Sequence, residues 1–140
     1  MGRNSEVTKA GVKLDAGKSP LTMGVLNYFP CALLAVADVS AYGAKKYDLE
    51  YSDKNWMRVP NGHERYSDAL GRHLVKEAID PLDDESGLHH DAMAAWNALA
   101  RLELRIRKRD AVARLQVAAK AALPGHDWDS LRDKPKNQNN

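Results

Sequence analysis

The stretch from Arg65 to Leu99, RYSDALGRHLVKEAIDPLDDESGLHHDAMAAWNAL, decides the fold of this chain. Apolar side chains recur in it at intervals of three and four residues, which is the period of a helix that buries one face. Pro81 and the pair Ser86-Gly87 interrupt this period, because proline and glycine disfavour the interior of a helix. The stretch therefore predicts two helices joined by a turn-rich connection.

The same signals extend the prediction to the rest of the chain. A first helix is expected to begin near Pro30, since proline is tolerated at the first helical position, and Gly43 should mark its end or a kink. The second helix should cover about Glu64 to Ile79. The third should begin near His89, with an interruption over Lys108 to Asp110. Its inner stripe is expected at Met93, Trp96, Leu99 or Ala100, and Leu102 or Ile106.

The chain has 140 residues, enough for one domain, and its alanine-rich composition favours helices over sheets. We expect an all-α protein, a small helical bundle. Residues 1–27 are read as an irregular N-terminal segment, residues 28–123 as the helical catalytic domain and residues 124–140 as a polar tail. A single cysteine, Cys31, excludes an internal disulfide and fits a reducing cytoplasm, and its apolar neighbours predict a buried thiol.

Composition argues against two classes of partner. The longest mostly apolar stretch, Tyr28 to Val39, is far short of the ~20 residues that span a bilayer, and Met1 to Lys18 lacks the apolar core of a signal peptide. The formal net charge of +2 is too small to indicate nucleic acid by itself. The basic run RLELRIRKR, Arg101 to Arg109, is typical of a solvated or intersubunit helix face.

Titratable side chains gather in the deciding stretch. His73, Glu77 and Asp80 are spaced i, i+4, i+7 and so project from one helix face. More acids and two histidines follow directly in the segment from Asp83 to Asp91. Acids this dense repel one another unless a cation lies among them, and carboxylates with some imidazole suit Mg²⁺ or Mn²⁺. Because such ions commonly bind phosphates, the pattern predicts a metal-dependent enzyme that acts on nucleotide phosphates.

The mechanism that fits these residues is attack of a metal-activated water on phosphorus, with two or more ions neutralising a triphosphate. The histidines can bind metal or orient the ligands through hydrogen bonds. We predict catalytic roles for His73, Glu77 and Asp80. The predicted metal ligands are Asp38, His73, Glu77, Asp80, Asp83, Glu85, His90 and Asp91.

A triphosphate also needs cations from the protein and a surface for its base. Trp56 offers a stacking plane beside the amide of Asn55, which suits a purine, and Trp96 with Asn97 is the alternative pair. The segment DAGKSP that carries Lys18 is not a P-loop, because it lacks the spacing G-x-x-x-x-G-K-S/T. The predicted substrate-binding residues are Lys18, Lys45, Lys46, Asn55, Trp56, Arg65, Arg72 and Asn97.

Several short motifs together resemble a known family. In chain order they are DAGKSP, AVADVSAYGAKKY, NW, RY, ALGRHL, DDESGLHH and AAWNAL, between Asp15 and Leu99. The chain resembles the phage dATP/dGTP diphosphohydrolase family, which belongs with the all-α, MazG-like nucleoside triphosphate pyrophosphohydrolases. Two positions depart from the family's pattern, which has Glu in place of Asp80 and His in place of Met93.

The resemblance implies a MazG-like helical bundle that hydrolyses a purine deoxynucleoside triphosphate, dGTP or dATP, to the monophosphate and pyrophosphate. It also implies Mg²⁺ or Mn²⁺, a role in the nucleotide pool of a phage-infected cell, and a homodimer or homotetramer. Some relatives serve phages that replace adenine with 2-aminoadenine. The helix from Asp91 to Leu123 is the expected interface, since one short chain would struggle to cover both its faces.

Two alternatives remain open at this point. In the first, His73, the dipeptide His90-Asp91 and Asp110 form the H…HD…D pattern of an HD-type phosphohydrolase, which commonly releases tripolyphosphate. In the second, the chain is a helical module without enzymatic activity whose basic run contacts nucleic acid or a protein. The second alternative leaves the histidines and carboxylates unexplained.

Overall fold

The computed structural model describes residues 17–127, and the regular elements in that range are all helical. The all-α prediction is therefore confirmed for this part of the chain. In chain order the elements are η1 (Thr22–Leu26), α1 (Pro30–Tyr47), η2 (Tyr51–Asp53), η3 (Asn55–Arg58), α2 (Gly62–Glu77) and α3 (His90–Ala122).

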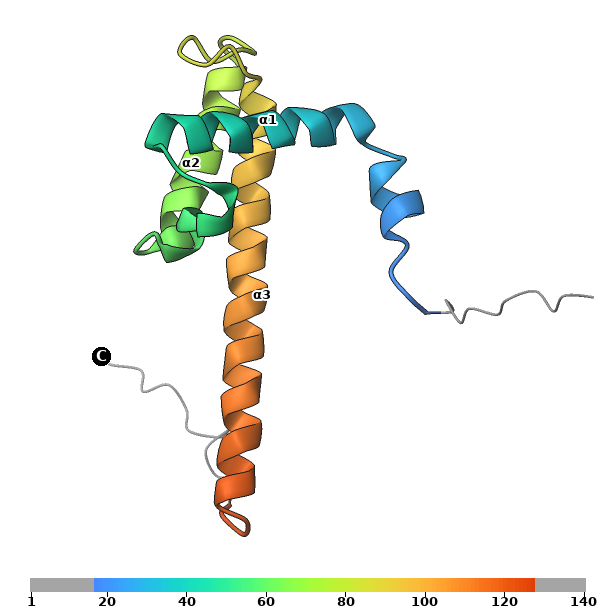
Figure 1. Ribbon diagram of the computed structural model, residues 1–140, viewed down its shortest axis with the longest axis vertical. Coiled ribbons are helices and arrows are strands. Elements are labelled where there is room, and N and C mark those ends of the chain that lie inside the picture. The colour runs from blue at the N-terminus through green and yellow to red at the C-terminus, as the bar shows by residue number, and fades with distance from the viewer. Residues whose placement is uncertain (1–16, 128–140) are drawn as a thin grey trace, which may run out of the picture.

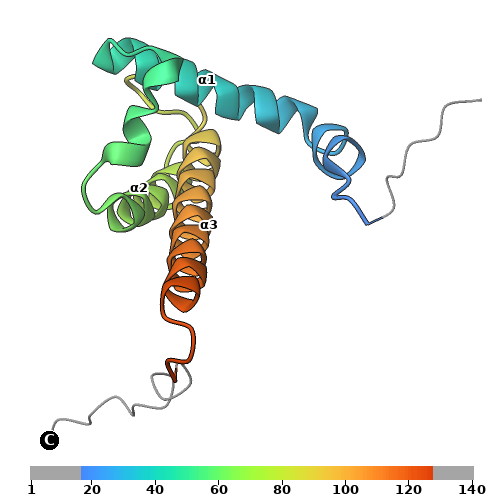
Figure 2. The same ribbon diagram turned by 60° about the horizontal axis from the view of Figure 1, so that its bottom comes forward.

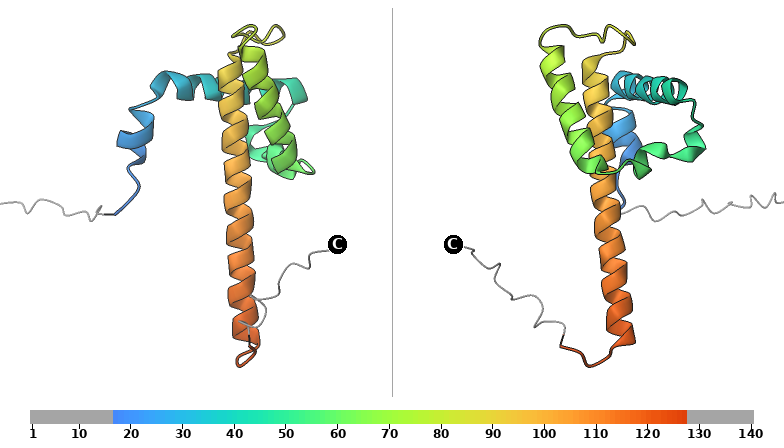
Figure 3. Two further views of the ribbon diagram at one scale, coloured as in Figure 1. Left: turned by 180° about the vertical axis from the view of Figure 1, so that it is seen from behind. Right: turned by 90° about the vertical axis from the view of Figure 1, so that its left-hand side faces the viewer.

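The helices meet at one end of α3. Figure 1 shows α2 lying alongside the first part of α3, with α1 crossing near the same end, and Figure 2 shows the same junction from a second direction. The remainder of α3 extends away from the other helices, as both views in Figure 3 make clear. Gly62 allows α2 to approach α3 closely, because a Cβ at this position would lie 3.1 Å from Cδ1 of Leu104 on α3.

Helix ends largely follow the predicted signals. α1 begins at Pro30 as expected, but it passes through Gly43 and ends before Asp48, which adopts a left-handed backbone conformation with φ of 52°. A single glycine costs a helix only about 1 kcal/mol relative to alanine, which is too little to end a helix by itself. α2 begins two residues before the predicted start and ends at Glu77, shortly before Pro81.

Two predictions about irregular segments were wrong. α3 continues through Lys108 to Asp110 without a break, because arginine and lysine are good helix formers and Glu103 pairs with Arg107 one turn later at 2.6 Å. Thr22–Leu26 forms a short π-helix inside the segment expected to be irregular. Residues 1–16 and 128–140, which include most of both predicted terminal segments, lie outside the described residues.

Trp96 is the side chain that ties the helices together. Its Nε1 donates a hydrogen bond to Oγ of Ser40 on α1 at 2.8 Å. Its ring meets Trp56 of η3 and Tyr66 of α2 edge to face, with centroids 6.2 and 5.7 Å away. Tyr66 in turn donates from its hydroxyl to the backbone oxygen of Trp56 at 2.6 Å. One residue of α3 therefore contacts three other elements.

The buried apolar core of the described residues is small and consists of Ala92, Met93, Ala94 and Ala100. The inner stripe predicted for the third helix is thus correct as far as Ala100, the alternative to Leu99, but Leu102 and Ile106 are exposed. Cys31 is exposed as well, so the prediction of a buried thiol was wrong. Leu102 and Ile106 are exposed because they lie on the opposite face of α3 from Leu104, which lies against Gly62 of α2.

The bond between Trp96 and Ser40 gives a direct test of this junction. We expect Ser40→Ala to lower the free energy of unfolding by about 1 kcal/mol, because the half-buried indole N–H loses its acceptor. Urea denaturation at fixed protein concentration measures the effect. Ser52→Ala, at an exposed position of η2, is the matched control and should unfold like the unaltered protein. Equal stability of the two variants would contradict this role for the bond.

Candidate functional site

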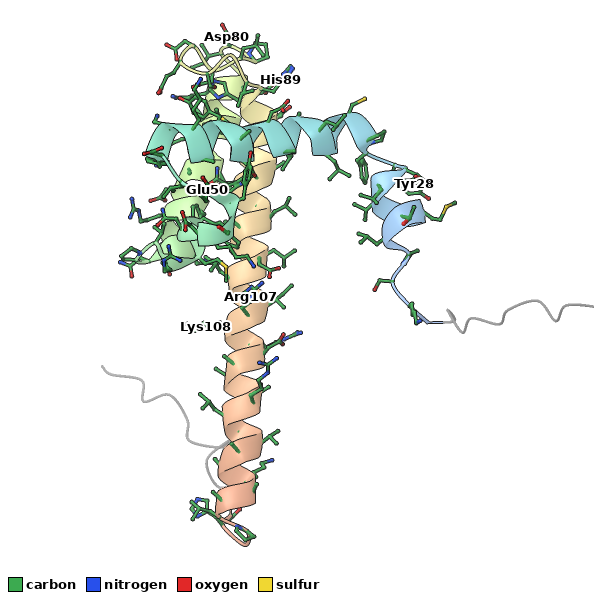
Figure 4. All side chains as sticks on the ribbon, viewed as in Figure 1. Tyr28, Glu50, Asp80, His89, Arg107 and Lys108 are labelled. Atoms are coloured by element: carbon green, nitrogen blue, oxygen red, sulfur yellow. The ribbon has the colours of Figure 1, made fainter. Side chains whose placement is uncertain are left out.

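A cleft of about 560 Å³ lies where the three α-helices meet. Its walls come from the second half of α1, the segment from Leu49 to Trp56, α2, the connection between α2 and α3, and the first turns of α3. Figure 4 marks Glu50, which lines this cleft, and Asp80, which lies in the connection shortly after the end of α2. The cleft therefore draws on parts of the chain that are distant in sequence.

One part of the cleft is aromatic. It contains Trp56, Tyr66 and Trp96, whose rings pack edge to face, and burial raises the pKa of the Tyr66 phenol. Two amides, Asn55 and Asn97, also line the cleft. Asn97 is buried, and its Nδ2 donates to the backbone oxygen of Met93 at 2.8 Å, which fixes the orientation of the amide. Flat rings beside amides suit a purine base.

The rest of the cleft carries charge. Lys46 comes from α1, and Arg72 and Lys76 come from one face of α2 because they are four residues apart. Asp83 and Glu85 reach the same cleft from the connection. The side-chain hydroxyl and backbone N–H of Ser86 both donate to Asp83 Oδ2, at 2.7 and 3.0 Å, and these bonds lower the pKa of the Asp83 carboxyl.

Two histidines form a pair behind this charged region. The Nδ1 atoms of His73 and His90 lie 3.1 Å apart, so one ring donates a hydrogen bond to the other. His90 is only 4% exposed, whereas His73 also lines the cleft. Burial, followed by the charge of His90 and of Lys76, lowers the pKa of His73, and Asp83 opposes this shift. The sequence patterns predicted these histidines on two different helices and did not indicate that their rings meet.

The predicted metal ligands do not come together as a complete set. Within residues 17–127 no three His, Cys, Asp or Glu side chains are arranged as a ready-made metal site. Asp38 and Asp91 are exposed and do not line the cleft. Glu77 does not line the cleft either. Asp80 is exposed and accepts a hydrogen bond from the backbone of Leu82 at 2.9 Å. The predicted ligands that line the cleft or adjoin its wall are His73, Asp83, Glu85 and His90.

More than half of the predicted substrate-binding residues line the cleft. Five of them line the cleft, namely Lys46, Asn55, Trp56, Arg72 and Asn97. Arg65 lines an adjoining cavity that shares Asn55, Arg72 and Asn97 with the cleft. Lys18 and Lys45 line neither. The prediction missed Tyr42 and Lys76, although Tyr42 precedes Lys46 by one turn and Lys76 follows Arg72 by one turn, a spacing that places each pair on one face.

The structure does not assemble the HD-type pattern. His73 and His90 meet, but Asp91 is exposed. Asp110 lies about 28 Å from Asp91 along the axis of α3, at the usual helical rise of 1.5 Å per residue. No residue of the basic run lines the cleft, and Figure 4 marks Arg107 and Lys108 on the part of α3 beyond it.

No helix within residues 17–127 is both long enough and apolar enough to cross a membrane.

Comparison with known proteins gives one family and one curated relative. A family model described as "dATP/dGTP diphosphohydrolase, N-terminal" matches residues 8–114. A protein of Salmonella phage PMBT28 named "dATP/dGTP diphosphohydrolase" is 40% identical over 86 residues, which are 61% of this chain and 26% of that relative. The chain thus spans about a quarter of the relative's length. No solved structure matches it. Because the family model covers most of its length, the chain belongs to the dATP/dGTP diphosphohydrolase N-terminal family.

Proposed function

We propose that the chain hydrolyses dATP or dGTP between the α- and β-phosphates and releases the monophosphate and pyrophosphate. The observation that carries the proposal is a single cleft with an aromatic, amide-bearing part and a cationic part, as a purine nucleotide requires. The name of the phage relative supports the substrate class. The biological role we propose is remodelling of the deoxynucleotide pool in the cytoplasm of a phage-infected cell.

The cleft suggests how its residues share the work. We assign the base to the aromatic part, where Trp56 and Asn55 offer a ring face and an amide. We assign the phosphates to Lys46, Arg72 and Lys76, which line the other part of the cleft. Three cations from two helices then surround the chain of phosphates and hold it in one direction.

His73 is the one predicted catalytic residue that lines the cleft. We propose that it contacts the attacking water through Nε2, because its Nδ1 is engaged by His90. His90 would fix the ring in this orientation. Glu77 and Asp80 keep no such position in the structure, because Glu77 does not line the cleft and Asp80 caps the backbone of the connection.

We also propose that the reaction requires Mg²⁺ or Mn²⁺. In nucleotide sites Mg²⁺ is commonly held by one or two carboxylates together with phosphate oxygens and water, so three preassembled protein ligands are not needed. Asp83 fits this requirement, because it lines the same cleft as His73 and its carboxylate is held there by hydrogen bonds from Ser86. When bound, such an ion neutralises phosphate charge and lowers the pKa of its water.

Self-association would cover apolar surface that a single chain leaves exposed. Large apolar side chains stay exposed on α3, among them Leu99 at 53% and Leu102 at 55%, and both line a groove of about 390 Å³ between α1 and α3. Soluble proteins rarely leave such a surface uncovered. We propose that a second copy of the chain covers it, giving a homodimer or homotetramer.

The oligomer predicts a solution mass of at least twice 15.5 kDa in sedimentation equilibrium. Leu102→Glu should shift the protein toward the monomer, because it places a charge in the apolar groove. Lys108→Glu, on the free part of α3, controls for the added acid. A monomeric unaltered protein would contradict the proposal.

The proposed activity is tested by incubating the protein with each dNTP and NTP, with Mg²⁺, with Mn²⁺ and with EDTA. We expect metal-dependent release of pyrophosphate together with dGMP or dAMP, resolved by chromatography. Tripolyphosphate and a nucleoside would instead support the HD-type alternative. Absence of turnover with every nucleotide would overturn the proposal and favour a binding module.

Paired histidine variants connect the activity to the cleft. We expect His73→Gln to lower kcat by about a hundredfold, which is typical for loss of a group that transfers a proton. His89→Gln is the control, because His89 is exposed and lines no part of the cleft. Equal activity of the two variants would exclude His73 from the reaction.

A further inference from the structure

Glu85 occupies an unusual position at the edge of the cleft. Its Oε1 accepts hydrogen bonds from the Tyr42 hydroxyl at 2.7 Å and from Lys46 Nζ at 2.8 Å. Lys46 also lies 5.6 Å from the centroid of the Tyr42 ring. All three side chains line the cleft. A carboxylate oxygen from the connection therefore accepts hydrogen bonds from a phenol and an ammonium group of α1.

These two donors form an anion-binding position. The hydrogen bonds from Lys46 and Tyr42 lower the pKa of the Glu85 carboxyl, and they raise the pKa of both donors. A phosphate oxygen resembles this carboxylate oxygen, because both carry negative charge and both accept hydrogen bonds from charged or neutral donors. Arg72 and Lys76 line the same cleft from α2, so a chain of phosphates would find further cations there.

The attachment of Glu85 is separable from the fold of its own turn. The turn from Asp83 to Leu88 is closed by its own hydrogen bonds, from Gly87 N to Asp83 O at 2.7 Å and from Asp83 N to Leu88 O at 2.8 Å. Within residues 17–127, this connection is hydrogen-bonded to α1 through the Glu85 carboxylate, which accepts both bonds. The side chain is 64% exposed, so water can take over its hydrogen bonds when it is released.

We propose that the Glu85 carboxylate occupies a phosphate position of the cleft, and that a polyphosphate displaces it from Lys46 and Tyr42 when it binds. This inference rests on the proposed function. The empty cleft is then held partly closed by an internal anion, and substrate binding frees the connection from α1. Tyr42 becomes a phosphate-binding residue that the sequence patterns did not indicate.

The competition is measured with inorganic tripolyphosphate as the probe, by calorimetry in EDTA. Glu85→Gln should tighten binding about two- to fivefold relative to the unaltered protein, the range expected when one exposed ion pair no longer competes. Asp84→Asn is the matched control, because it removes the same charge from the preceding residue of the same turn. The gain should shrink at high salt, where such pairs are screened.

Further variants identify the donors. Tyr42→Phe and Lys46→Met should each weaken binding of tripolyphosphate, and Glu85→Gln should give no gain in the Lys46→Met background. Glu85→Ala repeats the test without a side chain that can accept a hydrogen bond. Equal affinity of Glu85→Gln and Asp84→Asn would overturn the inference, and so would weaker binding by Glu85→Gln.

A metal-ligand role for Glu85 gives a different result. In that case Glu85→Gln would weaken binding when Mg²⁺ is present and have no effect of its own in EDTA. Failure of the inference is also distinct from failure of the proposed function. If the unaltered protein neither binds tripolyphosphate nor hydrolyses a nucleotide, both fail; if it does both while Glu85→Gln matches Asp84→Asn, only the displacement of Glu85 is wrong.

Discussion

The contact of Trp96 with its three neighbouring elements is the constraint on which the rest of the structure depends. The indole joins α3 to α1 through Ser40, to η3 through Trp56 and to α2 through Tyr66. The apolar core of the described residues otherwise consists of one methionine and three alanines, and each alanine buries little surface. The same aromatic group forms a wall of the cleft, so the residues that hold the helices together also shape the site.

The helices could be predicted from sequence because their signals are local. Pro30 and Pro81 mark a beginning and an end, and apolar spacing identifies the face of α3 that meets α2. The expected break in α3 failed because a run of arginines and lysines resembles a boundary in composition, yet each residue favours a helix. The exposed Leu102 and Ile106 show the limit of the stripe, since periodicity does not tell which face of α3 another helix covers.

The candidate site was predictable only in part for a related reason. Spacing places Arg72, His73 and Glu77 close together on α2, but it does not give the direction in which the cleft lies. The cleft lies on the side of His73 and Arg72, so Glu77 is left out. The contact of Glu85 with Tyr42 joins residues 43 positions apart, and no local pattern predicts such a contact. Dense acids indicated a cation, whereas the structure pairs one of them with a lysine.

A single cleft that holds both base and phosphates is the central claim, and hydrogen exchange with a non-hydrolysable dGTP analogue and Mg²⁺ tests it most directly. We predict slower exchange in residues 42–47 of α1, in residues 49–56 and in residues 72–76 of α2. Residues 107–122 of α3, which lie beyond the cleft, should exchange at an unchanged rate. Protection confined to residues 107–122, or no protection at a saturating concentration of the analogue, would contradict the account.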